Sequence, residues 1–216
     1  MHSMMFSSGQ TFPPPTTSPA APVEEVYENA APTSAEADLY GGVPEVDLGA
    51  PPYSAELADS RRKQFLTKKH SIPEKMQLYN CSTQGKIDEL KELLKEKSFS
   101  PTEEVSKEGH YWTVFHYASH YGHLKVLEFL IECLKDNENS YEILNMQTSE
   151  GKTPLFCAIL SGDIKPQVKK DIVKLLFDTC EIDIKLRKCT GEDLLDLARK
   201  NPPLYEFIVF KCLRED

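Results

Sequence analysis

Hydrophobic residues are unevenly patterned along this chain of 216 residues. Up to about Ser60 they follow neither the 3.6-residue period of a helix nor the alternation of a strand. From about Ile72 they recur in short blocks at helical spacing, separated by turn residues. The pattern predicts a helical part that begins near residue 72, preceded by a segment with too few apolar residues to fold.

The helical blocks repeat along the chain. A run that begins at Thr113 (TVFHYASHYGH) is followed forty residues later by one that begins at Thr153 (TPLFCAILSG). A run from Gly191 (GEDLLDLA) opens in the same way, and Leu78 and Cys81 occupy the equivalent positions of an earlier unit. A single pair of short helices cannot bury both of its faces, so such units are expected to stack.

Small residues fall at equivalent places in these units. Ala118, Ala158 and Ala198 lie inside the first helix of each unit, where a small side chain lets neighbouring helices approach closely. Gly122 and Gly162 follow that helix, and glycine can take the positive φ that often ends one. Gly85 has the same role in the earliest unit, and threonines 113 and 153 are expected N-caps.

These motifs resemble the ankyrin repeat, whose hallmark is T-P-L-H-x-A followed by G-H and an apolar second helix. Thr153–Leu155, His116, Ala118 and the pair Gly122-His123 carry the resemblance, which extends from about residue 72 to the C-terminus. It implies an all-α solenoid of about four helix-turn-helix units joined by short hairpins. It also implies that His116 and His123 hydrogen-bond neighbouring backbone.

Several features depart from the family pattern. Between Gly162 and Ile172 the third unit carries about six extra residues, including Pro166, so its turn or its helix ends must be enlarged. The loop 136–140 (DNENS) is an insertion. Tyr111 stands where the family prefers glycine in the hairpin. These changes are expected to alter the hairpins and to leave the helix stack intact.

The two ends of the array have the character of caps. Glu89 and Glu92 replace apolar residues of the later units, as suits a helix that faces water. At the other end Pro202 and Pro203 begin a helix, and the array is expected to be complete within residues 72–216. The apolar residues expected to seal the stack are Leu204, Phe207, Ile208, Phe210 and Cys212.

Charge and composition divide the chain into three segments. Residues 1–60 contain nine acidic and no basic residues and form a predicted disordered, Pro/Ala-rich arm; residues 61–71 form a basic linker; residues 72–216 form the repeat domain. The arm accounts for the net charge of −9, so residues 61–216 taken together are close to neutral and lack the strongly basic surface typical of nucleic-acid binding. The basic cluster 61–69 is interpreted as an ordinary solvated linker. The alternatives are a nuclear-import signal, a contact for acidic lipid, and a segment that folds back on the arm.

The location predicted for the chain is the cytoplasm or the nucleus. No apolar run is long enough to cross a bilayer, and the first residues have no signal-peptide character. The cysteines form no CxxC pair, and free thiols are expected, with disulfides or a cysteine metal site as a minor alternative. The six are Cys81, Cys133, Cys157, Cys180, Cys189 and Cys212.

By the resemblance, partners bind to the hairpin tips and the exposed face of the first helices. The candidate partner-binding residues are Trp112, Tyr117, His120, Tyr121, Lys152, Leu160 and Ser161, with Asn80, Thr83, Gln84, Glu192 and Lys200 in the outer units. Aromatic side chains with polar tips are common binding anchors. The alternative for Trp112 and Tyr117 is that they pack between neighbouring hairpins.

Four histidines, His110, His116, His120 and His123, lie within fourteen residues. The i, i+4 pair of His116 and His120 is an alternative zinc site, although the structural role implied by the resemblance is the expectation. No nucleophile elbow, phosphate loop or HExxH motif is present in the sequence. Neither catalysis nor a cofactor or metal is expected.

The arm carries short candidate motifs. Tyr27 lies in a VYEN sequence that resembles the ligands of some SH2 domains, and Tyr40 and Tyr53 lie in similarly acidic sequence. The function predicted for the whole chain is a scaffold or adaptor that binds a protein partner, with the arm as a second recruitment or tethering segment. A structural subunit of a larger assembly is the alternative, and a metal protein or enzyme a third. We expect a monomer or a subunit of a hetero-complex, without nucleic acid or membrane insertion.

Overall fold

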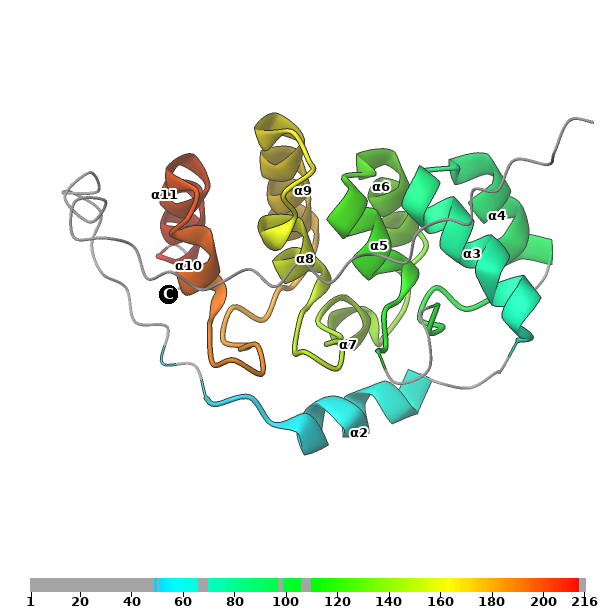
Figure 1. Cartoon of the computed structure of the whole chain (residues 1–216), viewed down its shortest axis with the longest axis horizontal. Coiled ribbons are helices and arrows are strands. Elements are labelled where there is room, and N and C mark those ends of the chain that lie inside the picture. The colour runs from blue at the N-terminus through cyan, green and yellow to red at the C-terminus, as the bar shows by residue number, and fades with distance from the viewer. Residues whose placement is uncertain (1–48, 50, 66–69, 97–98, 106–109, 214–216) are drawn as a thin grey trace, which may run out of the picture. The chain divides into compact units, whose positions relative to one another are not determined.

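The computed structural model describes residues 49, 51–65, 70–96, 99–105 and 110–213. Within these ranges the chain forms helices joined by turns and contains no strand (Figure 1). The predicted all-α class is therefore confirmed for the described part of the chain. Tyr27, Tyr40 and the rest of the arm up to residue 48 lie outside it.

Four helix pairs follow one another along the described chain. They are α3 (Ile72–Gln84) with α4 (Ile87–Glu96), α5 (Val114–Tyr121) with α6 (Leu124–Glu132), α8 (Pro154–Leu160) with α9 (Pro166–Thr179), and α10 (Leu194–Ala198) with α11 (Pro202–Cys212). The first helices, which we call the inner helices, pack in the order α3, α5, α8, α10; of the outer helices, α6 packs against α4 and α9. Two further helices, α2 (Ala55–Phe65) and α7 (Ser140–Leu144), lie outside the pairs.

The inner helices begin at the predicted caps. Thr153 Oγ1 accepts a hydrogen bond from the Phe156 amide at 3.2 Å, and Pro154 occupies the first position of α8. Thr113 is the N-cap of α5. In the fourth unit Asp193 takes over this role, because its carboxylate accepts from the amides of Leu195 and Asp196 at 3.0 Å each.

Glycine ends the first two inner helices but not the third. Gly85 and Gly122 adopt left-handed backbone with φ of 68° and 78°, as expected. Gly162 does not, because Ser161 ends α8 in extended conformation. The ammonium of Lys169 instead donates to the carbonyls at the end of α8, those of Ile159 at 2.8 Å and Ser161 at 2.7 Å. The positive φ expected at Gly162 is therefore a wrong prediction.

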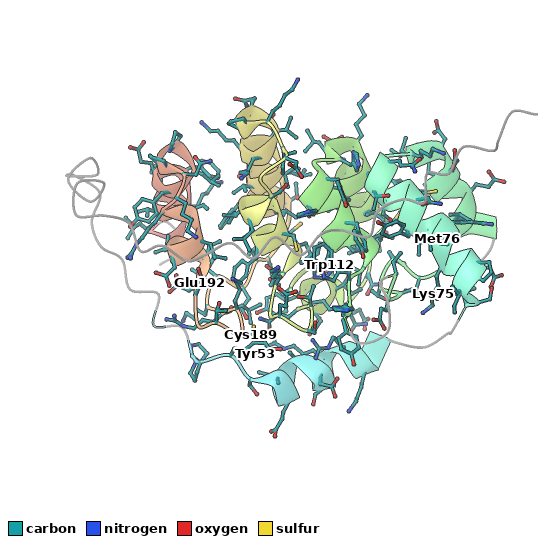
Figure 2. The ribbon with its side chains drawn as sticks, viewed as in Figure 1. Tyr53, Lys75, Met76, Trp112, Cys189 and Glu192 are labelled. Carbon is teal, nitrogen blue, oxygen red and sulfur yellow. The ribbon has the colours of Figure 1, made fainter. Side chains whose placement is uncertain are left out.

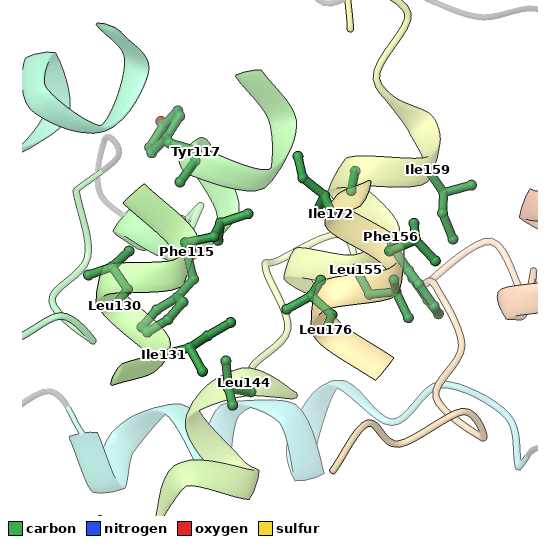
Figure 3. Close-up of a cluster of buried hydrophobic side chains, with 14 of the residues drawn as sticks. Phe115, Tyr117, Leu130, Ile131, Leu144, Leu155, Phe156, Ile159, Ile172 and Leu176 are labelled. Carbon is green, nitrogen blue, oxygen red and sulfur yellow. The ribbon is translucent and has the colours of Figure 1, made fainter. Parts of the chain in front are cut away.

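The core lies between the inner and outer helices of neighbouring pairs (Figure 3). Phe115 and Phe156 are the largest fully buried side chains and are at most 1% exposed. Ala118, Ala158 and Ala198 are fully buried, which agrees with their predicted role in letting helices approach. The largest fully buried aliphatic residues include Leu78, Leu90, Leu127, Leu130, Leu155, Ile172, Leu176, Leu194, Leu195 and Leu197.

The two insertions are accommodated in helices. The extra residues of the third unit lengthen α9, which has 14 residues against 9 in α6. The inserted loop 136–140 leads into α7, whose Ile143 and Leu144 are buried. Tyr141 of this helix donates from its hydroxyl to Asp183 at 3.1 Å. The enlarged helix predicted for the third unit is therefore found in α9, and the loop insertion leads into the additional helix α7, which packs on the stack.

The last helix seals the stack with one face only. Leu204, Ile208 and Cys212 are buried, and Phe207 packs edge-on against Phe177 at 6.4 Å. Phe210 is 52% exposed, so its predicted place in the seal is wrong. The reason is helical geometry, because positions 204, 208 and 212 share a face from which 210 points away. In the first unit, Glu89 and Glu92 are exposed, as expected.

Three segments between the pairs form hairpins, which we call fingers. The first finger comprises residues 99–105 and 110–113, the second residues 145–153 and the third residues 183–193. A backbone bond closes each of them: Val105 to Trp112 at 2.8 Å, Thr148 to Lys152 at 2.9 Å, and Lys188 to Glu192 at 2.9 Å. Neighbouring fingers are joined by bonds from Ser149 to His110 and from Cys189 to Glu150.

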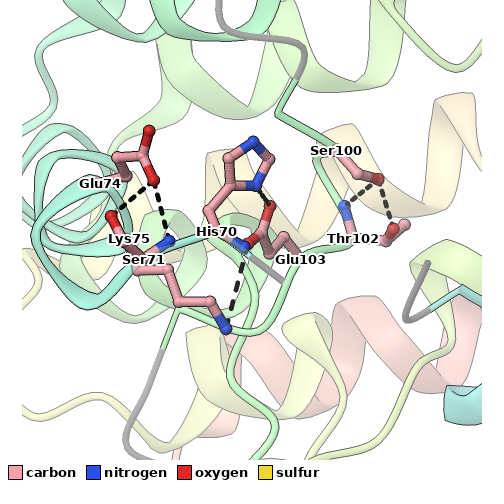
Figure 4. A network of polar contacts seen from close by, with 7 residues as sticks. All are labelled: His70, Ser71, Glu74, Lys75, Ser100, Thr102 and Glu103. Carbon is pink, nitrogen blue, oxygen red and sulfur yellow. Dashed lines mark hydrogen bonds and ion pairs between the residues drawn. The ribbon is translucent and has the colours of Figure 1, made fainter. Parts of the chain in front are cut away.

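A polar network ties the start of α3 to the first finger (Figure 4). Glu103 is 4% exposed, and its carboxylate lies 2.6 Å from Nδ1 of His70 and accepts from the His70 amide at 3.2 Å. The His70 ring stacks on Phe99 with centroids 3.9 Å apart. Ser71 and Glu74 form a capping box at the first turn of α3. This start is therefore fixed by side chains as well as by packing.

Helix α2 crosses the boundary predicted between the arm and the basic linker. Ser54 accepts from the Leu57 amide at 3.2 Å, and Asp59 pairs with Lys63 at 2.7 Å, which supports a helix at i, i+4 spacing. Ala58 and Arg62 are buried, at 2% and 5% exposure. The disordered arm predicted up to residue 60 and the linker predicted from residue 61 are thus corrected in part: residues 55–65 form a helix, and its Arg62 contacts the fingers.

In the described residues no helix is both long enough and apolar enough to cross a membrane. The cysteines are free thiols. Cys81, Cys157 and Cys212 are buried, whereas Cys133 and Cys189 are exposed. Burial raises the pKa of the Cys157 thiol to about 12 and that of Cys81 to about 11, so both are protonated at neutral pH.

Candidate functional site

Five aromatic rings from two repeats meet on the inner helices and form what we call the aromatic patch: Tyr79, Trp112, Tyr117, His120 and Tyr121. Trp112 lies 4.9 Å from Tyr117 and 5.6 Å from His120, measured between ring centroids. Tyr79 meets Tyr117 edge-on at 5.1 Å across the boundary between the first two repeats. These geometries are those that aromatic pairs prefer.

Helical spacing positions the members of the patch. Tyr117, His120 and Tyr121 are separated by three and four residues on α5, so they share one face of that helix. Trp112 directly precedes the N-cap Thr113 and folds back toward this face, so that its ring meets His120 edge-on. Tyr79 occupies the neighbouring position on α3.

The patch is closed at its centre and open at its edges. Tyr117 is only 8% exposed and forms the floor, whereas Tyr121 is 36% exposed. Along α3 the surface continues to Met76, which is 50% exposed (Figure 2). It continues further to Ile72, which is 80% exposed. Ile72, Met76 and Tyr79 lie four and three residues apart, so they share a helix face. Together the patch and these two residues form the inner-helix face.

The inner-helix face carries no charge at its centre at neutral pH. Burial raises the pKa of Tyr117 and Tyr121 above the ordinary value for tyrosine. Burial also lowers the pKa of His120, and the nearby ammonium of Lys152 lowers it further. The three side chains therefore stay neutral, while Lys152 and Asp163 supply charge around them.

The structure brings four of the predicted partner-binding residues together, namely Trp112, Tyr117, His120 and Tyr121. Lys152 lies in the second finger, half-buried and paired with Glu150 at 2.6 Å. Leu160 is half-buried against the core. Ser161 is 1% exposed and its carbonyl is bound by Lys169, so its predicted place on an open surface is wrong.

For Tyr117 the sequence left two interpretations, a binding anchor and a residue that packs between neighbouring hairpins. It packs between neighbouring units, as the alternative for Trp112 and Tyr117 anticipated, because its ring contacts both Tyr79 and Trp112. The buried Tyr117 ring therefore supports the more exposed rings of the patch. Trp112 packs on Tyr117 in the same way and keeps a half-buried surface.

The sequence reasoning missed Tyr79, Met76 and Ile72. For the first repeat it favoured Asn80, Thr83 and Gln84, of which Asn80 and Gln84 are exposed and Thr83 is half-buried. The available signal was the spacing of the three apolar residues, since positions 72, 76 and 79 lie on one helix face. The core-facing residues of α3, such as Leu78 and Cys81, lie on another.

His116 and His123 bind backbone of neighbouring segments, as the resemblance implied. Nε2 of His123 lies 2.7 Å from the carbonyl of Thr83, one repeat away. Nδ1 of His116 accepts from the Thr113 amide, and Nε2 lies 3.0 Å from the Met146 carbonyl. Both nitrogens of His116 are thus engaged, which leaves no lone pair for the alternative zinc site. The described residues hold no cluster of three metal-ligating side chains.

Tyr53 is the one arm tyrosine among the described residues, and it is half-buried just before α2. The exposed His110 lies in the first finger, where its carbonyl binds Ser149. The outer-unit candidates Glu192 and Lys200 differ: Glu192 is bound to Lys188 at 2.7 Å, and Lys200 is exposed. None of these residues contributes to the aromatic patch.

A protein-family model described as ankyrin repeats in three copies matches residues 78–188. Among solved structures, a chain of the crystal structure of the yeast ribosomal protein Rps3 in complex with its chaperone Yar1 is 22% identical, with a TM-score of 0.55; the match covers 67% of this chain and 95% of that one. A crystal structure of EF0377, an ankyrin repeat protein, is 20% identical with a TM-score of 0.50, over 68% of this chain and 65% of that one. No curated protein matches. At these identities the likeness concerns the fold.

Proposed function

This chain belongs to the ankyrin-repeat family, and on that premise we propose that it is a scaffold or adaptor that holds a protein partner on the inner-helix face. Ankyrin repeats indicate a module for protein–protein interaction, and the single observation that carries the finer proposal is the aromatic patch with its exposed extension on α3. The fold similarity to a chain of a chaperone–ribosomal protein complex agrees with a protein as the partner.

The chemistry of the inner-helix face favours a protein ligand. Tyrosine, tryptophan and methionine are enriched where proteins bind proteins, because they bury much area for little lost rotamer entropy or adapt to a partner's shape. Ile72 and Met76 expose apolar surface without an outer helix to cover it, and exposed apolar residues that adjoin an aromatic patch are typical of an interaction site. The mechanism is equilibrium binding, with no bond made or broken.

The surroundings of the patch suggest which partner segment fits. Lys152 and Asp163 provide one charge of each sign close to His120. A segment with a central apolar or aromatic side chain, flanked by polar groups, can bury its centre on the rings and pair its flanks with these charges. Since Lys152 is already paired with Glu150, the charges contribute little to association, which is expected to depend only weakly on salt.

We predict that the double substitution Met76→Ala and Tyr121→Ala weakens partner binding by at least tenfold. The two side chains are exposed, so their loss removes contact area without opening a cavity, and two lost anchors are worth about 2–4 kcal/mol in binding. The measurement is quantitative capture from native extract on the immobilised full chain, with the identified partner then titrated against wild type and variant.

The matched control is Phe210→Ala, which removes an equally exposed apolar side chain from α11. It is expected to bind like wild type, and all three proteins are expected to share the same helicity by circular dichroism. Equal partner affinity for the double variant and wild type would remove the inner-helix face from the proposal.

We further propose that the chain acts without catalysis in the cytoplasm or nucleus. Its free thiols, of which Cys81 and Cys157 are buried with raised pKa, suit a reducing compartment. The hydrogen-bonded histidines His116 and His123 serve the fold and not a reaction.

A further inference from the structure

Arg62 of α2 is buried in the row of fingers, outside the aromatic patch. Its guanidinium Nη1 donates to the carbonyl of Gln147 at 2.9 Å and to that of Thr148 at 3.0 Å. Its Cζ lies 4.2 Å from the centre of the Tyr111 ring. Only 5% of the residue is exposed. One arginine therefore joins α2 to the first finger through Tyr111 and to the second finger through two carbonyls.

Tyr111 is held in a conformation that tyrosine rarely adopts. Its φ is 58°, and among the described residues it is the one non-glycine position with positive φ. The equivalent positions of the next two fingers are Gly151 and Gly191, with φ of 77° and 91°. A side chain at such a position is disfavoured relative to glycine. Arg62 stacks on the Tyr111 ring, which a glycine at this position would not provide.

The geometry of these contacts suits arginine better than lysine. Its recognition elements are a flat ring and two backbone carbonyls 2.9 and 3.0 Å from one nitrogen, and a planar guanidinium can stack and donate at the same time. Lysine can serve as a point charge only.

The attachment of α2 leaves one buried polar atom without a partner in the described residues. The Nε of Arg62 is buried without a hydrogen-bond partner among the described residues, which lowers the gain from docking. The carboxylate of Asp59 lies 3.7 Å from Nη2 of Arg62. Because Asp59 is also part of α2, this ion pair does not join the helix to the fingers. Ala58 is the one apolar side chain of α2 that is buried in the described range, while Leu57 is 53% exposed. Among the side chains of α2 that the structure describes, Arg62 is the one that donates hydrogen bonds to the fingers.

We propose that α2 is an intramolecular latch whose Arg62 fills an arginine site formed by the first and second fingers, and that an arginine-bearing segment of a protein partner competes with α2 for it. The inference goes beyond the proposed function, because it uses none of the inner-helix residues. When the latch opens, it exposes the Tyr111 ring and the carbonyls of Gln147 and Thr148 on the fingers.

Hydrogen exchange in the full chain tests the latch. In Arg62→Ala the amides of residues 56–64 are expected to exchange at least tenfold faster than in wild type. The control is Lys63→Ala, which removes the neighbouring exposed charge, 72% exposed, and its pairing with Asp59. An exposed pair at this spacing stabilises a helix only slightly, so its loss is expected to accelerate exchange by less than about threefold. Equal acceleration in the two variants would overturn the latch.

Tyr111→Gly separates the latch from a loss of folding. Glycine relieves the positive φ, so the midpoint of thermal unfolding is expected to stay equal or rise, while α2 exchanges at least fivefold faster because the ring is gone. In the double variant with Arg62→Ala the two effects on α2 are expected to overlap instead of multiplying, since both remove one interaction. Unchanged exchange of α2 in Tyr111→Gly would contradict the site.

The competing partner segment is tested with a peptide of residues 53–65 added to the full-length Arg62→Ala chain, whose own latch is open. Saturable shifts of the Thr148 and Tyr111 amide signals are expected at millimolar peptide, the concentration range of a tethered segment. The same peptide with Arg62→Lys is expected to cause no saturable shift. No shift with either peptide, or equal shifts with both, would refute the arginine site. The capture experiment on the inner-helix face can succeed or fail independently of this result.

Discussion

Replacing Gly151 with alanine is expected to lower the free energy of unfolding by about 3 kcal/mol or more. Gly151 has a φ of 77°, which disfavours any side chain. A Cβ at this position would also lie 2.8 Å from the Cys189 nitrogen and 2.9 Å from the Lys188 Cα. Both neighbours are backbone atoms of the third finger, so no side-chain rotation can relieve the clash.

Gly191 is the matched control for this prediction. It occupies the equivalent position of the third finger with a φ of 91°, and nothing lies within 4 Å of a Cβ added there. Gly191→Ala is therefore expected to cost only the conformational term, about 1–2 kcal/mol. Urea denaturation of both variants measures the difference. Equal losses would show that the contact between the second and third fingers does not stabilise the stack.

The second large effect is expected at His116, whose replacement by alanine should cost about 3 kcal/mol. The ring is fully buried, and its Nδ1 accepts from the Thr113 amide at 3.2 Å. That assignment places the proton on Nε2, which donates to the carbonyls of Met146 at 3.0 Å and Lys152 at 3.2 Å. Alanine leaves a cavity and removes the partner of all three groups.

His110→Ala is the matched control for His116, because this histidine is exposed on the same segment of chain. It is expected to change the free energy of unfolding by no more than about 0.5 kcal/mol. Chemical denaturation at pH 7.5 gives both values. A His116→Ala variant as stable as the His110→Ala variant would contradict the structural role of His116.

His116 also predicts how stability depends on pH. Burial lowers its pKa from 6.5 to about 4. The unfolded chain therefore takes up the proton first as the pH falls, so the stabilising contribution is complete above about pH 6.5 and is lost progressively down to about pH 4. The loss over this range is about 3 kcal/mol. Burial lowers the pKa of His120 as well, which acts in the same direction.

Urea denaturation between pH 7.5 and pH 5 measures this dependence. In wild type the free energy of unfolding is expected to decrease by up to about 1.4 kcal/mol per pH unit for this one group. The His116→Ala variant should show a smaller slope over the same interval. Identical slopes in the two proteins would mean that His116 does not titrate as its burial requires.

The sequence predicted the repeat stack well, because the features that define it are local. Thr153 and Pro154 specify a helix start, Gly122 specifies a helix end, and the apolar spacing specifies which faces are buried. The hydrogen bonds of His116 and His123 were also anticipated, since the resemblance supplied a partner that lies far away in the sequence.

The errors arose where a distant residue decided the outcome. Gly162 is not left-handed because Lys169, from the next helix, binds the carbonyls that a glycine turn would otherwise satisfy. Residues 51–65 have too few apolar side chains to predict a docked helix. Arg62 joins α2 to two backbone carbonyls of the second finger and to the Tyr111 ring. Contacts of this kind leave no periodic signal in the sequence.

The candidate site was predicted in part. Trp112, Tyr117, His120 and Tyr121 were found because they cluster in one repeat, and the structure shows that their rings meet. Tyr79 was missed because it joins them from the neighbouring repeat, at a distance that depends on how α3 and α5 pack. Ser161 was misplaced because the end of α8 departs from the family pattern.

Site-specific photo-crosslinking tests the central claim, that a protein partner binds the inner-helix face. A photoreactive phenylalanine analogue replaces Tyr121 on α5 in one full-length protein and the exposed Lys174 of the outer helix α9 in another. Irradiation in native extract is expected to join one discrete partner to the protein labelled at position 121 and to give at most weak, diffuse adducts at position 174. The same discrete adduct formed predominantly at position 174, or none at 121 while the partner is bound, would contradict the account.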